Sequence, residues 1–162
     1  DPAFPELRTN PIAELHFGVV DTDWEVLSAD SEYDEQNRKE NILLNNQYPW
    51  ISGKTAELPH EFLVDMKRDY EVRGFIYTPA WTPGHILKYE FYVGDSPDNV
   101  NTLAGRGSFG DILNMPVQQV VRFEKSFRAR YYRFRATANA SGRRYASVFR
   151  WCPAQGRRHA CF

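Results

Sequence analysis

Trp81 is the residue best placed by its surroundings to bind a ligand. It lies in the loop Pro79-Ala80-Trp81-Thr82-Pro83-Gly84, between two aromatic-rich segments that are typical of strands. The prolines restrict the loop backbone, so the indole can be held in place and loses little freedom on binding. A flat indole can stack on the apolar face of a pyranose, and a loop tip usually lies at the surface. The alternative is that Trp81 folds over the strand ends and closes the core.

Side chains that could carry catalysis or hold a metal show no arrangement typical of either role. The four histidines lie far apart without metal-ligand spacing, and the two cysteines form no C-x-x-C pair: His16, His60, His85, His159, Cys152 and Cys161. No G-x-S-x-G nucleophile elbow is present. Acidic residues gather early in the chain and could include a glycosidase pair: Asp21, Asp23, Asp30, Glu32, Asp34 and Glu35. We expect a solvated loop instead, because a catalytic pair usually comes from separate elements around a concave site.

The segment Gly105-Arg106-Gly107-Ser108-Phe109-Gly110 fits the pattern G-x-G-x-x-G. That pattern binds a pyrophosphate where it leaves a strand and opens a helix. Here residues 101–104 look turn-like, and residues 111–116 end in a proline. The acidic residue expected about 20 positions further on is also missing. We therefore predict a glycine-rich edge strand and turn.

Basic residues concentrate in the segment 122–135, where they are interleaved with aromatic residues. Such a mixture could hold single-stranded nucleic acid. The alternative is a strand with Tyr132 and Phe134 facing inward and arginines facing outward toward surface acids. Lys and Arg number 20 against 21 Asp and Glu, and the resulting net charge of -1 favours the strand. We expect no nucleic-acid partner.

The hydrophobic pattern of the remaining chain predicts an all-β domain. Strand-like segments lie near residues 24–29, 62–66, 72–77, 87–93, 106–109, 117–123, 129–137 and 145–151. Turn residues separate them at fairly regular spacing, and no convincing amphipathic helix intervenes, although a turn or two of helix fits residues 34–44. This order favours a β-sandwich or jelly roll of antiparallel strands.

The predicted domain covers residues 21–151, with a proline-rich leader or linker at 1–20 and a tail at 152–162. In the tail, Cys152 and Cys161 could form a disulfide or remain two free thiols. Because the chain begins with Asp1, we expect a processed or excised piece. No apolar run reaches the roughly 20 residues needed to span a bilayer, so we expect no membrane insertion.

An ordered set of stretches between Trp24 and Trp151 is similar to a known family. In chain order, the stretches are Trp24-Glu25-Val26-Leu27-Ser28-Ala29, Trp50-Ile51-Ser52, Phe62-Leu63-Val64-Asp65-Met66, Val72-Arg73-Gly74-Phe75-Ile76-Tyr77-Thr78-Pro79, Gly84-His85-Ile86-Leu87-Lys88-Tyr89-Glu90-Phe91-Tyr92-Val93, Val120-Val121-Arg122-Phe123, Ala129-Arg130-Tyr131-Tyr132-Arg133-Phe134 and Tyr145-Ala146-Ser147. The set resembles the F5/8 type C (discoidin-like) domains. Within that group it resembles the family 32 carbohydrate-binding modules of secreted bacterial exo-glycosidases, of the hexosaminidase (chitobiase) or fucosidase type.

The resemblance implies a galactose-binding-like jelly-roll sandwich whose loops at one end bind a terminal sugar, without catalysis. It also implies a covalently linked catalytic domain upstream and a secreted, periplasmic or cell-surface location. The carbohydrate-binding residues expected here are Trp81, His85, Tyr145, Arg143 and Arg144. Family members often carry an arginine and an asparagine where this chain has Ala80 and Thr82 or Pro83, so we do not expect the usual galactose-type site.

This chain also differs from the family at the positions of the calcium ligands. The acidic calcium ligands of the family stand here as Leu44 or Asn45 and as Ser147, so a structural calcium would find few anionic oxygens. We expect no other cofactor.

Two further classes of function stay open. One is a structural spacer or protein-docking domain that has lost its sugar site. The other is a free-standing glycosidase, which would have to turn over a glycoside as this fragment alone.

Overall fold

The computed structural model describes residues 23–44, 48–80, 84–110, 112, 117–140, 142, 144–148 and 150–155. The elements are β1 (Glu25–Ala29), the short 3-10 helix η1 (Lys39–Ile42), β2 (Trp50–Ile51), β3 (His60–Thr78), β4 (Ile86–Gly94), β5 (Thr102–Ser108), β6 (Gln119–Asn139), β7 (Ser147–Val148) and β8 (Arg150–Gln155). All described strand pairs are antiparallel. The predicted all-β fold and the turn of helix within residues 34–44 are confirmed.

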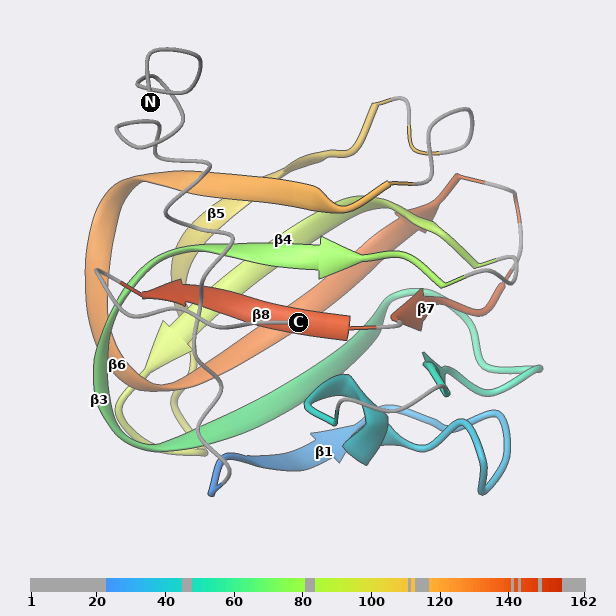
Figure 1. Cartoon of the computed structure of the whole chain (residues 1–162), viewed down its shortest axis with the longest axis horizontal. Coiled ribbons are helices and arrows are strands. Elements are labelled where there is room, and N and C mark those ends of the chain that lie inside the picture. Colours follow the sequence, from blue (N-terminus) through green and yellow to red (C-terminus); the bar gives the residue numbers. More distant parts are fainter. Residues whose placement is uncertain are drawn as a thin grey trace, which may run out of the picture.

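Two long bent strands, β3 and β6, build both layers of the sandwich (Figure 1). In one layer the order is β1, the first part of β3, the second part of β6, β4 and β5. In the other layer, the first part of β6 and the second part of β3 pair with each other, and β8 extends this sheet along β3. A separate two-stranded sheet joins β2 to β7.

The sequence predicted separate strands at 62–66 and 72–77, and again at 117–123 and 129–137, whereas each pair forms one continuous strand. The prediction was wrong because the connecting residues are polar and break the apolar alternation. In the structure these residues form the bend between the layers, where the register between β3 and β6 shifts between Asp65 and Tyr70. Lys67 has a positive φ of 71° at this bend.

The core between the layers is aromatic. Phe75 of one layer lies 5.3 Å from Phe91 and 5.0 Å from Tyr89 of the other, measured between ring centroids. The first pair is stacked and the second is edge-to-face, both favourable arrangements for aromatic rings. Burial of each such ring stabilises the fold by about 1.5–3 kcal/mol. Aromatic residues make up 15% of the sequence, and many of them are used for packing in this core.

The G-x-G-x-x-G segment lies in the edge strand β5 and the turn after it, as predicted. The strand begins at Thr102, so the prediction of a turn at residues 101–104 was wrong. A side chain at Gly105 would place its Cβ 2.8 Å from the ring of Phe123. The glycine thus allows the edge strand to lie directly on a buried ring, which explains it without a phosphate ligand.

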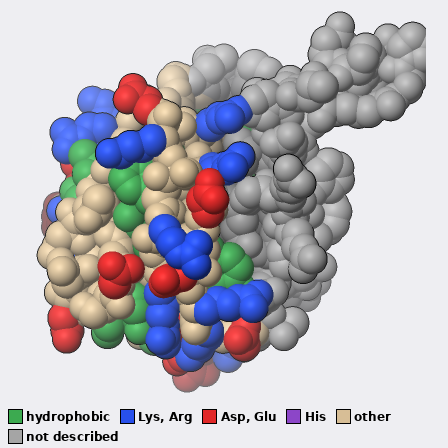
Figure 2. Space-filling model, turned by 90° about the vertical axis from the view of Figure 1, so that its left-hand side faces the viewer, with side chains coloured by type: hydrophobic (Ala, Val, Ile, Leu, Met, Phe, Trp, Pro, Cys, Tyr) green, Lys and Arg blue, Asp and Glu red, His purple; other side chains and the backbone are tan. Residues whose placement is uncertain are grey.

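The basic segment is the predicted strand. Tyr132 and Phe134 are fully buried, while Arg135 donates from Nε to Glu61 Oε2 at 3.1 Å. Figure 2 shows basic and acidic side chains interspersed on one face of the molecule. Interspersed charges of both signs do not make the continuous basic track that nucleic-acid binding requires.

Strand β8 continues to Gln155, four residues past the predicted domain end at Trp151. The predicted leader at 1–20 and Cys161 lie outside the described residues, so a Cys152–Cys161 disulfide stays a prediction. In the described part of the chain, no helix has the length and apolar character needed to cross a bilayer.

Candidate functional site

Four segments that are distant in sequence meet at one end of the sandwich, on the right in Figure 1. They are residues 30–33, 51–57, 84–86 and 144–147. Backbone hydrogen bonds join them in series: Tyr33 N donates to Ile51 O at 2.7 Å, Ser52 N to Ala146 O at 2.9 Å, and Ser147 N to Gly84 O at 2.9 Å. We call this surface the loop end.

Two tyrosines form the exposed aromatic surface of the loop end. Tyr145 is half-buried and Tyr33 is 37% exposed, and their ring centroids lie 6.0 Å apart at an interplanar angle of 70°. The ammonium of Lys54 lies 5.1 Å from the centre of the Tyr33 ring. Together they offer apolar ring surface next to hydrogen-bond donors, the combination that a sugar needs.

Gly84 and Asn139 fix the position of Tyr145 at the loop end. Gly84 has a φ of 109°, and a Cβ there would lie 3.0 Å from both Cδ2 and the carbonyl oxygen of Tyr145. The side-chain amide of Asn139 donates to that same carbonyl at 2.5 Å. Gly84 therefore allows the two loops to approach closely enough for Tyr145 to pack between them.

Arg144 lies beside Tyr145 on the rim of the loop end. Its guanidinium is 3.5 Å from the Glu57 carboxylate, and the two side chains are 65% and 75% exposed. A pair this exposed contributes little to stability. The guanidinium donors of Arg144 are therefore accessible to solvent, and its role in sugar binding stays a prediction.

His85 also lies at the loop end, but it bonds to its own loop. Its Nε2 is 2.9 Å from the carbonyl oxygen of Ala80. Because a carbonyl only accepts, Nε2 carries the proton and donates. Ala80 is only 3% exposed, so the position at which relatives carry arginine is buried here. The predicted site residues Trp81 and Arg143 lie outside the described residues.

A buried histidine, His60, lies beneath the loop end. Its side chain is fully buried, its Nδ1 is 2.8 Å from Asp30 Oδ2, and its Nε2 bonds to the backbone carbonyl of Arg144. Burial opposes a charge on the ring, but the bonds to Asp30 and to the Arg144 carbonyl outweigh it, and the pKa of His60 is raised.

Sequence analysis missed Tyr33, Lys54 and His60. Tyr33 is the lone aromatic residue in the polar run 30–41, and that was the available signal. Nothing local marks Lys54 or His60, because their partners lie 21 and 84 positions away in sequence.

Asp30, Glu32 and Asp34 of the early acidic cluster take part in the structure of the loop. Asp30 bonds His60 and accepts from Glu61 N at 2.8 Å, and Asp34 accepts from Asn37 N at 2.8 Å. Glu32 accepts from Lys39 N at 2.5 Å. These bonds explain three of the six carboxylates as loop structure, in line with the predicted loop, while Asp21 lies outside the described residues.

The described residues at the family's calcium positions offer no carboxylate to a hard cation. Leu44 is 42% exposed and apolar, while Ser147 is buried and Asn45 lies outside the described residues. Within the described ranges, no three His, Cys, Asp or Glu side chains come together as a metal site. We assign no cation here.

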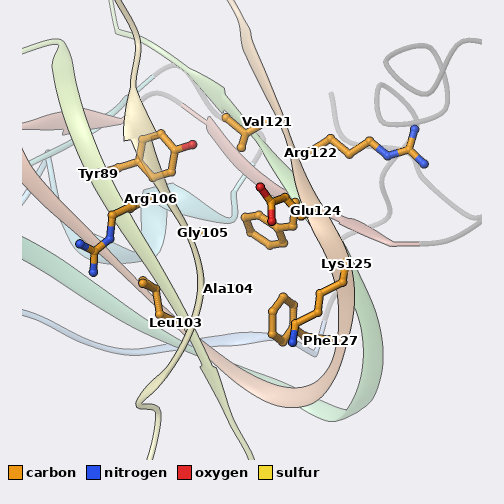
Figure 3. A pocket seen from close by; sticks show the side chains of 11 residues that line it. Tyr89, Leu103, Ala104, Gly105, Arg106, Val121, Arg122, Glu124, Lys125 and Phe127 are labelled. Atoms are coloured by element: carbon orange, nitrogen blue, oxygen red, sulfur yellow. The ribbon is translucent and has the colours of Figure 1, made fainter.

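A hollow of about 850 Å³ lies away from the loop end, between β5 and the first part of β6 (Figure 3). Its lining includes Phe123, Phe127 and Leu103. Arg106 and Arg122 point to opposite sides of it in Figure 3. Because two edge strands form its walls, we interpret it as the open side of the sandwich.

Solved structures share this fold at low sequence identity. A CBM32 module from a family 31 glycoside hydrolase of Clostridium perfringens is 23% identical with a TM-score of 0.77, covering 89% of this chain and 98% of that one. The family 32 CBM of C. perfringens NanJ, solved in complex with galactose, is 20% identical with a TM-score of 0.71, covering 85% and 97%. The C-terminal domain of a chitobiase from Bacteroides fragilis is 18% identical with a TM-score of 0.72, covering 85% and 97%.

Sequence comparison gives the family. Comparison with curated protein sequences finds no match. The model of the F5/8 type C domain matches residues 26–151, which span β1 to the start of β8 and include the described part of the loop end. The predicted resemblance is confirmed, and the chain belongs to the F5/8 type C domain family.

Proposed function

We propose that this chain is a noncatalytic carbohydrate-binding module that binds a terminal sugar at the loop end and targets an attached, secreted glycosidase to glycans. The observation that carries the proposal is the pair formed by exposed Tyr33 and half-buried Tyr145, with Lys54 against the Tyr33 ring. Neighbouring structures support it: the NanJ module is in complex with galactose, and the CBM32 of AlyQ is in complex with 4,5-unsaturated mannuronic acid.

In this proposal the tyrosine rings supply apolar contact, and Lys54 and Arg144 donate to sugar hydroxyl groups. Trp81, Arg143 and His85 stay predicted contributors from the same loops. Since Ala80 is buried at the family's arginine position, the sugar is bound differently from the usual galactose-type mode. Affinity at one site should be weak, and tethering to an enzyme raises the effective concentration at the glycan.

The test is a glycan array followed by calorimetric titration of the sugar that binds. Tyr145→Ala and Tyr33→Ala should each weaken binding by about tenfold, because each removes a ring from the contact surface. Trp81→Ala tests the predicted indole in the same assay. Tyr92→Ala is the matched control, since Tyr92 lies six residues along β4 from Ile86, about 20 Å from the loop end. Unchanged binding by both tyrosine variants would reject the proposed surface.

A spacer or protein-docking domain is the second candidate. Buried Ala80 favours it, because no guanidinium stands at the family's sugar-binding position. So does the bond of His85 to its own loop. A blank glycan array together with a stable contact to a neighbouring catalytic domain would support this candidate. In either case we expect no turnover of aryl glycosides by this chain alone.

A further inference from the structure

His60 connects two of the segments that form the loop end. Its Nδ1 faces the carboxylate of Asp30, which follows β1, at 2.8 Å. Its Nε2 faces the carbonyl of Arg144, the residue before Tyr145. The Asp30 carboxylate also accepts hydrogen bonds from Ser31 Oγ at 3.0 Å and from Glu61 N at 2.8 Å. The imidazole therefore ties the loop that carries Tyr145 to the first strand connection.

Both partners of this imidazole are acceptors. A backbone carbonyl cannot donate, so Nε2 must carry a proton, and an ionised carboxylate cannot donate, so Nδ1 must carry one too. Only the imidazolium satisfies both bonds. Neutral His60 would keep a single N–H and lose one of the two connections.

The charged surroundings of His60 favour this doubly protonated form. Asp30 and Glu57 are the anionic groups that act on it, and the guanidinium of Arg144 is directed to Glu57 at 3.5 Å. Across the strand pair, His60 faces Ala136 of β6, which carries no charge. Although burial opposes the charge, the pKa of His60 lies above its usual value of 6.5.

The other described anchors of residues 144–147 do not titrate near neutral pH. Asn139 donates to Tyr145 O, Ser52 bonds both the N and O of Ala146, and Gly84 accepts from Ser147 N. Tyr77 Oη donates to Ser147 O at 2.9 Å, and burial raises the pKa of that hydroxyl. The bond from His60 is thus the described anchor that pH can switch.

We infer that His60 is a positioning residue for the proposed sugar site: its imidazolium holds the Arg144–Tyr145 backbone, so that saccharide affinity falls when the ring loses its proton. This inference rests on the proposed function. Both bonds are complete below pH 6.5, and one of them is lost as the pH rises through the raised pKa of His60 in the folded state. Losing one hydrogen bond should weaken binding by about three- to tenfold.

The experiment combines NMR titration of the histidine rings with the dissociation constant of the best-binding sugar, both between pH 5 and about pH 9. We expect the affinity midpoint to coincide with the titration of His60. Asp30→Asn keeps the shape of the side chain and an acceptor for Glu61 N, but it places an amide N–H opposite Nδ1. Neutral His60 can then accept at Nδ1 and still donate from Nε2 to the Arg144 carbonyl. The NMR midpoint of His60 should therefore move to lower pH, and the wild-type affinity midpoint should disappear. His60→Gln keeps a side-chain donor and should give weaker affinity without that midpoint.

The outcomes separate this inference from the proposed function. Affinity that does not change across the His60 titration in the wild-type protein would overturn the inference, as would an Asp30→Asn variant that keeps the wild-type affinity midpoint. If no sugar binds at any pH, the proposed function fails. Backbone NMR shifts of residues 144–147 then test by themselves whether His60 holds this loop. Shifts that follow His60 support its hold on the loop, and shifts that do not follow it overturn that hold. The wild-type and Asp30→Asn measurements decide the question even if His60→Gln does not fold.

Discussion

Gly84 shows how one residue without a side chain can set the position of a binding residue. Its φ of 109° lies in a region that L side chains rarely adopt, and its missing Cβ leaves the space that Tyr145 occupies. Sequence placed Gly84 in a loop and Tyr145 near another strand. Their contact makes the glycine part of the proposed site.

Replacing this glycine should disturb both stability and binding. We expect Gly84→Ala to lower the free energy of unfolding by about 1–3 kcal/mol, because alanine is strained at this φ and its Cβ meets Tyr145. Urea denaturation measures the change, and sugar titration should show weaker binding. Gly110→Ala is the control: a Cβ there meets nothing within 4 Å, so the change should stay within about 0.5 kcal/mol. Equal effects from both variants would contradict this role for Gly84.

Strands β3 and β6 are tied together at their bend by a charged pair. Arg130 donates to both carboxylate oxygens of Asp65, from Nε to Oδ1 at 2.9 Å and from Nη2 to Oδ2 at 3.0 Å. The Asp65 side chain is 7% exposed, and hydrogen bonding from Arg130 is the main reason why its pKa lies below the usual 3.8. The bond holds the two strands in register where the regular ladder is interrupted.

Arg130→Met should destabilise the protein at neutral pH, because it leaves the largely buried Asp65 carboxylate without the two guanidinium donors. The cost is reduced by solvent screening, since the Arg130 side chain is partly exposed. Because the folded pKa of Asp65 is lowered, this contribution is complete above pH 3.8 and is lost as the pH falls through the folded value. Urea denaturation across that range should show the two proteins converging.

Arg128→Met is the matched control for this pair. Arg128 lies 3.7 Å from Asp69, with side chains that are 74% and 51% exposed. Its loss should change stability by less than about 0.5 kcal/mol at any pH. A pH-independent cost for Arg130→Met would show that its aliphatic packing, and not the Asp65 bond, is what matters.

At the scale of the whole molecule, the two layers cannot be separated, because β3 and β6 belong to both. The aromatic core lies between the layers, with Phe75 of one against Phe91 of the other. Neither layer can open without exposing rings that the other covers. The sandwich is therefore one cooperative unit.

We expect a single unfolding transition in urea, with coincident curves from tryptophan fluorescence and far-ultraviolet circular dichroism. Trp24 and Trp50 are 7% and 0% exposed and so report on the core, while circular dichroism reports on the strands. Gly84→Ala should move this transition without dividing it. Two resolved transitions, or curves that do not coincide, would contradict the shared-strand description.

The sequence by itself determined the all-β class, the inward Tyr132 and Phe134, the edge strand at Gly105 and the family. Alternation and turn residues are local, and local patterns survive in any sequence that must bury one face of a strand. Only the tertiary structure decided that segments 62–66 and 72–77 are one strand and that Tyr33, Lys54 and Tyr145 share a surface. These outcomes depend on contacts between residues far apart in the chain, and such contacts form only when the two layers close on their common core.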